Sequence, residues 1–363
     1  MNPVASHFSQ TYAEAREKFC AAAAAAGGRF RSHRNPTTGP DGGALYMDTV
    51  RFGADEAPNM LAMMAATHGV EGFCGSGAMI AWLRAGGPAK LPAGTGALLI
   101  HGVNPHGFAW IRRVNEDNVD LNRNFVDHGK PYPVNAGYVE LADALTPQRY
   151  DAASLAKAQL VLDNYVQKHG AFAFQGAVSA GQYTHPGGMF HGGNKPTWSN
   201  RTIRRVIRDE LGAAKRIGCI DYHTGLGPFG HGELINPAPR GSGSFDLAVR
   251  WYGDECTSPE VGDSKSAIVT GAVMDAFPQE APDAAFCGIA IEYGTYPVDE
   301  VLEAVRRDNW LHLHGTLDSE QGRAFKAYMK ERFYPAGTKW AEMVCVRSRE
   351  VIGKTIAGLN APA

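Results

Sequence analysis

The chain has 363 residues, of which 44% are hydrophobic and 20% are charged, and its formal net charge is −2. This composition is typical of a globular protein, and without a basic stripe it gives no indication of nucleic-acid binding. No segment approaches the roughly 18 consecutive apolar residues that a membrane-spanning helix needs. We therefore expect neither a nucleic-acid partner nor a membrane partner.

The N-terminal segment is rich in alanine and reads MNPVASHFSQTYAEAREKFCAAAAAAGG. A signal peptide would have a basic start, an apolar core and a small-residue cleavage site. Here charged residues between Glu14 and Lys18 interrupt the region before the alanine run. We predict a helix within residues 1–30, ended by Gly27-Gly28 and packed on one catalytic domain that spans residues 1–363.

Four short apolar runs predict buried strands at Asn59–Thr67, Ala97–Val103, Arg216–Tyr222 and Gly288–Tyr293. Helices are predicted at about 73–85, 151–168, 198–214, 246–254, 298–314, 319–332 and 338–356. Continuous apolar strands that alternate with helices are typical of an α/β protein with a mainly parallel sheet covered on both faces. In such sheets, binding sites gather at the carboxyl ends of the strands.

The first of these strands runs directly into a candidate metal-binding turn, THGVEG, at residues 67–72. Its glycines permit a tight backbone path, so His68 and Glu71 can both face one ion. A catalytic zinc usually has three protein ligands, and His223 in DYHTG follows another apolar run. A single H-x-x-E match is weak by itself, but together the three side chains predict one zinc ion, with cobalt or manganese as alternatives.

A polar segment lies between the ligand segments and reads RRVNEDNVDLNRNF at residues 112–125. A surface loop would explain its polarity, but not why arginines and amides cluster after a buried strand. Arginine suits bidentate recognition of a carboxylate, and a second arginine can polarise a carbonyl as negative charge develops. The segment therefore predicts a site for a substrate with a free carboxylate.

Five pieces, HGVE, NPHGF, RVNEDNVDLNRNF, DYHTG and IEYGT, occur in this order within residues 59–297, about two thirds of the chain. With them the sequence resembles the zinc carboxypeptidase family, which includes the aspartoacylase and succinylglutamate desuccinylase branch. The resemblance implies an eight-stranded mixed sheet between helices. It also implies a single zinc ion held by His68, Glu71 and His223.

The resemblance further assigns roles around the metal. Glu292, at the end of GIAIE, would be the general base, and Asp120 would orient His68. Arg113 would polarise the scissile carbonyl, with the adjacent Arg112 as the alternative in that register. Asn122 and Arg123 would grip the free carboxylate of the substrate.

These roles predict a cytoplasmic, zinc-dependent metallopeptidase of the carboxypeptidase type, acting on peptides or peptide-like substrates. The nearest alternative is an N-acyl-amino-acid amidohydrolase on the same zinc site, and a third is a binding protein that has lost the chemistry. Serine chemistry is disfavoured because the chain has no G-x-S-x-G elbow. The cytoplasmic location follows from six scattered cysteines without a C-x-x-C pair, typical of reduced thiols.

The chain departs from the family's peptide-cleaving members in lacking a tyrosine between Tyr252 and Tyr293. Tyr252, Tyr183 or Tyr296 would replace the family's mobile tyrosine, or closure over the substrate would differ.

Two further features bear on the pocket. The loop at residues 181–200, rich in Gly, Pro and aromatic residues, is either a wall of the pocket or a structural Ω-loop. Its His185 and His191 are not expected to bind zinc. Asp275 would favour basic substrates if it lies on the pocket floor.

Overall fold

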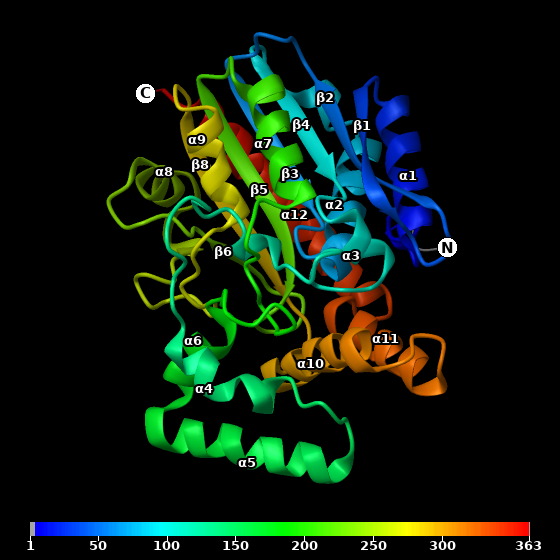
Figure 1. The fold of residues 1–363 in the computed structure, drawn as a ribbon. Coiled ribbons are helices and arrows are strands. Elements are labelled where there is room, and N and C mark those ends of the chain that lie inside the picture. The colour runs from blue at the N-terminus through cyan, green and yellow to red at the C-terminus, as the bar shows by residue number, and fades with distance from the viewer. Residues whose placement is uncertain (1–3, 363) are drawn as a thin grey trace.

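The fold is built around one mixed sheet of eight strands, in the order β1-β2-β4-β3-β5-β8-β6-β7 (Figure 1). The computed structural model describes residues 4–362. The strands are β1 (Arg29–Thr38), β2 (Ala44–Phe52), β3 (Asn59–Ala65), β4 (Thr95–His101), β5 (Arg216–Gly225), β6 (Gly232–Ile235), β7 (Cys256–Thr257) and β8 (Ala285–Gly294). The central strands β4, β3, β5 and β8 are parallel, whereas β1–β2, β2–β4 and β6–β8 pair antiparallel. The predicted α/β class with a mixed, mainly parallel sheet is confirmed.

The continuous apolar runs reflect burial on both faces of this sheet. In β3, Leu61 and Met63 point into one core, and Met60 and Met64 point into the other. The first core lies under α1 (Tyr12–Ala25), α2 (Gly72–Arg84), α8 (Gly243–Tyr252) and α12 (Thr338–Asn360). The second lies under α7 (Trp198–Leu211) and α9 (Ala276–Glu280), so helices cover both faces (Figure 1).

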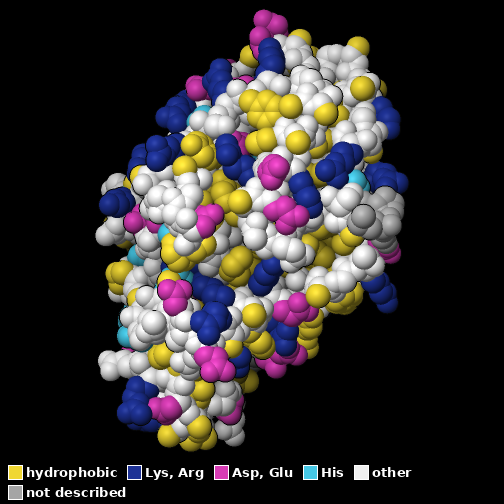
Figure 2. Space-filling model, turned by 90° about the vertical axis from the view of Figure 1, so that its right-hand side faces the viewer, with side chains coloured by type: hydrophobic (Ala, Val, Ile, Leu, Met, Phe, Trp, Pro, Cys, Tyr) yellow, Lys and Arg dark blue, Asp and Glu magenta, His cyan; other side chains and the backbone are white. Residues whose placement is uncertain are grey.

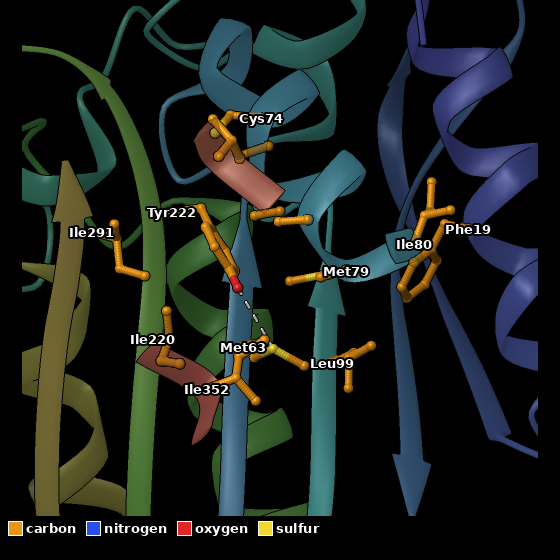
Figure 3. Packing of buried hydrophobic residues seen from close by; sticks show 14 of the residues in the cluster. Phe19, Met63, Cys74, Met79, Ile80, Leu99, Ile220, Tyr222, Ile291 and Ile352 are labelled. Carbon is orange, nitrogen blue, oxygen red and sulfur yellow. Dashed lines mark hydrogen bonds between the residues drawn. The ribbon is translucent and has the colours of Figure 1, made fainter. Parts of the chain in front are cut away.

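The first core joins the sheet to the N-terminal helix. Figure 3 shows Met63, Leu99 and Ile220 on adjacent strands, with Met79 of α2 near Met63 and Leu99 and with Phe19 of α1 farther along the same core. The hydroxyl of Tyr222 contacts the Met63 sulfur at 3.8 Å and the Ser348 hydroxyl at 2.6 Å. The Tyr222 hydroxyl therefore has hydrogen-bond partners although the ring is packed in an apolar layer.

A third hydrophobic core lies beyond the carboxyl ends of the central strands (Figure 1). It is formed by α4 (Ala136–Leu145), α5 (Ala152–His169), α6 (Ala171–Ser179), α10 (Val298–His314) and α11 (Glu320–Phe333). The short helices are α3 (Pro105–Ala109), η1 (Ala5–His7), η2 (Gly69–Glu71), η3 (Pro88–Lys90), η4 (Leu121–Arg123), η5 (Gly253–Glu255) and η6 (Val273–Asp275). This helical layer faces the edge of the sheet where sites are expected.

All four predicted strands and all seven predicted helices are present, with boundaries shifted by a few residues. The N-terminal helix is α1, which buries Tyr12 and Phe19 and is followed by Gly27 at φ 76°. Strands β1, β2, β6 and β7 and helices α3, α4, α6 and α9 were not predicted individually. The assignment of residues 1–363 to one catalytic domain stays a prediction.

On the face that Figure 2 shows, basic and acidic side chains are interspersed and form no large patch of one charge. Within residues 4–362, no helix has both the length and the apolar content needed to cross a bilayer. The six cysteines are all free, and four of them are buried.

Candidate active site

The three predicted metal ligands converge at the carboxyl ends of β3 and β5. His68 lies just beyond β3, Glu71 ends η2, and His223 lies near the end of β5, which is paired in parallel with β3. His68 Nδ1 lies 2.9 Å from Glu71 Oε1, and His223 Nδ1 lies 3.0 Å from Glu71 Oε2. The two Nδ1 atoms are 3.2 Å apart. All three side chains are buried.

The donor set fits a tetrahedral ion. Bonds of about 2.0–2.1 Å give edges of about 3.3 Å between ligand atoms, close to the separations of 2.9 to 3.2 Å found here. Two imidazole nitrogens and one carboxylate oxygen thus lie close enough together to bind a single dication. Among residues 4–362, this is the one group of His, Cys, Asp and Glu side chains arranged to hold a metal.

Each imidazole has a carboxylate next to its Nε2 atom, on the side of the ring away from the metal-binding centre. His68 Nε2 lies 3.2 Å from Asp120 Oδ1, and His223 Nε2 lies 2.8 Å from Asp221 Oδ2. Thr67 Oγ1 donates to both oxygens of Asp221 at 2.9 Å. The Asp221 contact places the His223 ring proton on Nε2 and leaves Nδ1 for the metal. The His68 ring is oriented by Asp120, and its Nε2 also lies 2.8 Å from Arg113 Nη2. Asp221 was not predicted, although a D-x-H spacing on a strand places both side chains on one face.

The electrostatics of the ligand cluster favour ionised carboxylates. Burial alone would raise the pKa of Glu71, but the two imidazoles lower it below its usual value. Burial would likewise raise the pKa of Asp120, but Arg113 and His68 lower it well below its usual value. Both groups are therefore available as anions, one for the metal and one for its histidine.

The ligand turn depends on close backbone packing. A Cβ at Gly69 would lie 2.0 Å from the carbonyl carbon of Gly107, so no other residue fits without moving that backbone. The amides of Gly69 and Val70 donate to the carbonyls of Arg113 and Arg112 at 3.1 and 2.8 Å. The turn is thus tied directly to the arginine segment.

Glu292 lies beside His223 because β5 and β8 pair in parallel with these two residues in register. Its Oε1 accepts a hydrogen bond from the amide of Leu226 at 2.9 Å. No described residue is hydrogen-bonded to its Oε2. Burial first, and then the charge of Glu71, raise the pKa of Glu292 to about 8. A positive ion at the ligand cluster would lower this pKa again.

The adjacent arginines point in different directions. Arg113 Nε donates to Asp120 Oδ2 at 2.9 Å, and its Nη1 lies 3.2 Å from Glu71 Oε1. Arg113 also lines the central cavity. Arg112 instead pairs with Asp308 at 3.0 Å and is not among the cavity-lining residues. The structure therefore brings Arg113, and not Arg112, to the site.

Asn122 and Arg123 both line the cavity. Asn122 Oδ1 accepts from the amide of Val273 at 3.0 Å, which leaves its amide nitrogen for another partner. Arg123 donates to the carbonyls of Asn122 and Ser179, but its buried Nε has no partner among the described residues. An unsatisfied guanidinium donor suits an anionic ligand.

The cavity has a volume of about 760 Å³. His68, His223, Glu292 and Arg113 line it on the side of the sheet, and side chains of α6, α10 and the segment 259–275 line it elsewhere. Its size is that of a site for a small ligand. Asp275, expected on the pocket floor, is one of the lining residues.

The loop at residues 181–200 both lines the cavity and supports the arginine segment. Phe190 is a lining residue, and its ring lies 5.2 Å from the Arg113 guanidinium carbon. The carbonyl of His191 accepts from the Asp120 amide at 2.8 Å. The Tyr183 hydroxyl donates to the Arg123 carbonyl at 2.6 Å.

The tyrosines considered as replacements for the family's mobile tyrosine lie elsewhere. Tyr252 bonds to Thr355 within the core, Tyr296 bonds to Glu331, and Tyr183 bonds to Arg123. Within residues 4–362, no tyrosine lines the cavity. In this conformation, therefore, none of the three takes that place.

Fold and site together define an α/β protein with a buried two-histidine, one-glutamate metal-binding group at the carboxyl edge of its sheet. The chain belongs to the family described as Protein of unknown function (DUF2817), whose profile matches residues 8–347. No curated protein matches the chain.

Several solved structures are similar in fold. Thrombin activatable fibrinolysis inhibitor (TAFI) is 11% identical with a TM-score of 0.48, over 95% of this chain and 74% of that chain. An aspartoacylase family protein from Mesorhizobium loti is 14% identical with a TM-score of 0.37, over 81% of this chain and 68% of that chain. The product-bound ectoine utilization protein EutE (DoeB) from Ruegeria pomeroyi is 13% identical with a TM-score of 0.37, over 81% and 69%. The aspartoacylase branch indicated by the motifs is thus represented, but similarity at this level carries no argument about activity.

Proposed function

We propose that this protein is a zinc-dependent hydrolase that cleaves an amide bond next to a free carboxylate, as a metallopeptidase of the carboxypeptidase type. One observation carries the proposal. The atoms of His68, Glu71 and His223 converge within bonding range of a single ion, and Glu292 stands on the neighbouring strand in register with His223. A metal group and a carboxylate base at one cavity are the parts that metal-assisted hydrolysis requires.

The residues divide the chemistry between them. Zinc, when bound, would acidify a water molecule and polarise a carbonyl. Glu292 accepts a proton with Oε2 while the Leu226 amide holds Oε1, and it later returns that proton to the leaving amine. Arg113 stabilises negative charge that develops on the carbonyl oxygen, for which its guanidinium has to release Glu71.

Arg123 and Asn122 orient the substrate by its carboxylate. The unpartnered Nε of Arg123 and the free amide nitrogen of Asn122 both belong to residues that line the cavity. A substrate carboxylate would satisfy the buried guanidinium, and this gain would be lost with an amidated or esterified substrate. This supports a substrate with a free carboxylate beside the scissile bond.

The size and lining of the cavity favour a peptide or peptide-like substrate over a small acyl amino acid. The cavity measures about 760 Å³, and apolar side chains such as Phe174, Val178 and Val305 form much of its wall away from the sheet. An acetyl or succinyl group would leave most of this apolar surface uncovered. A residue of a peptide on the amino side of the scissile bond would cover more of it.

We also propose that the enzyme acts in the cytoplasm. The support is that all six cysteines are unpaired, as is usual in a reducing compartment.

The test combines metal removal with the variant Glu292→Gln. Treatment with a chelator is expected to abolish hydrolysis of short peptides, and zinc to restore it. Glu292→Gln is expected to lower kcat by about 100-fold to 10,000-fold while zinc content stays at one ion per chain, because Gln cannot accept the proton. Glu233→Gln is the matched control, since Glu233 faces Glu292 across β6 and β8 but does not line the cavity.

The outcomes separate the rival functions. Faster zinc-dependent hydrolysis of acetyl- or succinyl-amino acids than of peptides would favour the amidohydrolase. A zinc-loaded wild-type protein without hydrolysis of either class would favour a binding protein. Full activity of Glu292→Gln would contradict the assigned base.

A further inference from the structure

A second buried charged cluster lies behind the arginine segment and outside the cavity. It contains Arg112, Asp308 and Lys326, with His312 beside them. Arg112 Nε donates to Asp308 Oδ2 at 3.0 Å, and Lys326 Nζ donates to Asp308 Oδ1. The Asp308 side chain is 4% exposed. Buried charges of this kind persist only where they are paired, so the cluster holds α10 and α11 against residues 110–113.

Lys326 uses its remaining donors on the backbone and on a histidine. Its Nζ lies 2.8 Å from the carbonyl oxygen of Trp110, 3.4 Å from that of Ile111 and 2.7 Å from His312 Nε2. Burial, and then Lys326 itself, lower the pKa of His312 to about 3, so this imidazole is neutral and can accept. The ammonium thus contacts two successive carbonyls of the turn that precedes Arg113.

The turn held in this way has an unfavourable backbone conformation. Ile111 has a φ of 53°, a region that a β-branched side chain rarely occupies. Such strain persists where surrounding contacts enforce it, and it gathers at functional sites. Here the enforcing contacts come from Lys326 on one side and from Arg112, whose amide donates to the Gly107 carbonyl at 2.8 Å, on the other.

The conformation at Ile111 decides where the next two side chains point. Arg112 enters the buried cluster, and Arg113 enters the site, where it contacts Glu71 and Asp120. The carbonyls of the same two arginines accept from the amides of Val70 and Gly69 in the metal-binding turn. A relaxed backbone at 110–111 would therefore displace both the guanidinium of Arg113 and the ligand turn.

We propose that Lys326, together with Asp308, is a positioning residue that holds the strained turn at Ile111 and so places Arg113 and the metal-binding turn. The hydrogen-bond partners of Lys326 do not line the cavity, so it would act through the backbone of residues 110–113. The kinetic part of this inference rests on the proposed hydrolase function. Its metal-binding part does not.

The test uses Lys326→Met, which keeps the length of the side chain and removes its donors. Lys330→Met is the matched control, one turn along α11, where the ammonium bonds to Gln10 instead. For Lys326→Met we expect kcat to fall about tenfold with KM little changed, and zinc affinity to fall about tenfold, as for other groups that orient metal ligands. Lys330→Met is expected to leave both unchanged.

A double-mutant cycle with Arg113→Ala then shows whether Lys326 acts through Arg113. In the Arg113→Ala background and at saturating zinc, Lys326→Met is expected to change kcat by less than about twofold. The proposal would be overturned if the two substitutions together lowered kcat by the product of their separate effects. It would also be overturned if Lys326→Met and Lys330→Met bound zinc with equal affinity. If Lys326→Met fails to fold, Asp308→Asn is measured with the same expectations.

The two proposals fail in distinguishable ways. A wild-type protein that binds zinc but hydrolyses nothing contradicts the proposed function, and the comparison of zinc affinities then decides the positioning role alone. A hydrolase whose zinc affinity and kcat do not respond to Lys326→Met contradicts the positioning role alone.

Discussion

The two sides of the cavity differ in how their residues are held. On the sheet side, strand register sets the positions of His223 and Glu292, and His68 follows directly after the end of β3. On the helical side, α6 and α10 contribute apolar side chains to the cavity wall. These helices belong to the third hydrophobic core, in which no strand residue takes part among those described. The difference suggests that the sheet side carries the chemistry and the helical side carries the fit to the substrate.

Beyond the loss expected for Glu292→Gln, the largest expected effect concerns recognition of the substrate carboxylate by Arg123, which lines the cavity. Arg123→Lys keeps the charge but loses the planar donor pair. We expect kcat/KM for substrates with a free carboxylate to fall roughly 50-fold, the loss typical of a hydrogen bond to a charged group, and KM to carry most of the change. Amidated substrates, measured in parallel, should respond little.

Arg201→Lys is the control for this change, because Arg201 is exposed on α7. Equal losses on free and amidated substrates would mean that Arg123 supports the fold and does not read the carboxylate.

An intermediate effect should come from the helical side, where α6 offers a matched pair of phenylalanines. Phe174 lines the cavity, whereas Phe172 is 82% exposed. Phe174→Ala is expected to lower kcat/KM on peptides about tenfold, because it removes apolar contact with the substrate, and to leave zinc content unchanged. Phe172→Ala should have no effect. If Phe174→Ala reduced zinc binding, the division of labour between the two sides would be wrong.

The smallest expected effect is at Asp275, where the two sides meet. Although Asp275 is exposed, desolvation by the surrounding cavity wall raises the pKa of its carboxyl to about 6, so the folded state binds a proton more tightly than the unfolded chain does. This group therefore favours folding at low pH, and that contribution is lost as the pH rises through about 6.

Asp275→Asn removes this dependence. We expect the variant to gain about 1 kcal/mol of unfolding free energy relative to wild type between about pH 4 and pH 7, a value reduced for the solvent that reaches the cavity. Denaturant unfolding at the two pH values measures it. A gain that is the same at both values would show that the Asp275 carboxyl titrates normally.

Sequence patterns predicted the sheet side well because its signals are local. The apolar runs of β3, β5 and β8 are buried on both faces, and each run is followed within a few residues by a ligand or the base. Because these strands are parallel, their carboxyl ends lie at the same edge of the sheet, so the local signals are enough to predict that the residues meet. That the residues perform the proposed roles stays a prediction.

The helical side was less visible because its signals depend on packing. Helix α6 reads AFAFQGAVS, in which apolar residues occur all around, so no face identifies the cavity wall. Strand β1 reads RFRSHRNPTT and is mostly exposed, so it lacks the alternation of a half-buried strand. The choice between Arg112 and Arg113 was open for a related reason, because it depends on the backbone at Ile111 and not on either side chain.

The pairing of His223 with Glu292 has a consequence for motion. Because these residues occupy matched positions in adjacent strands, their backbones cannot separate without breaking the hydrogen bonds between β5 and β8. Any movement of the cavity wall that accompanies substrate binding is then expected in α6, α10 or the segment 259–275, which line the cavity away from these two strands. The backbone separation between His223 and Glu292 should accordingly stay constant when a substrate binds, whatever the opposite wall does.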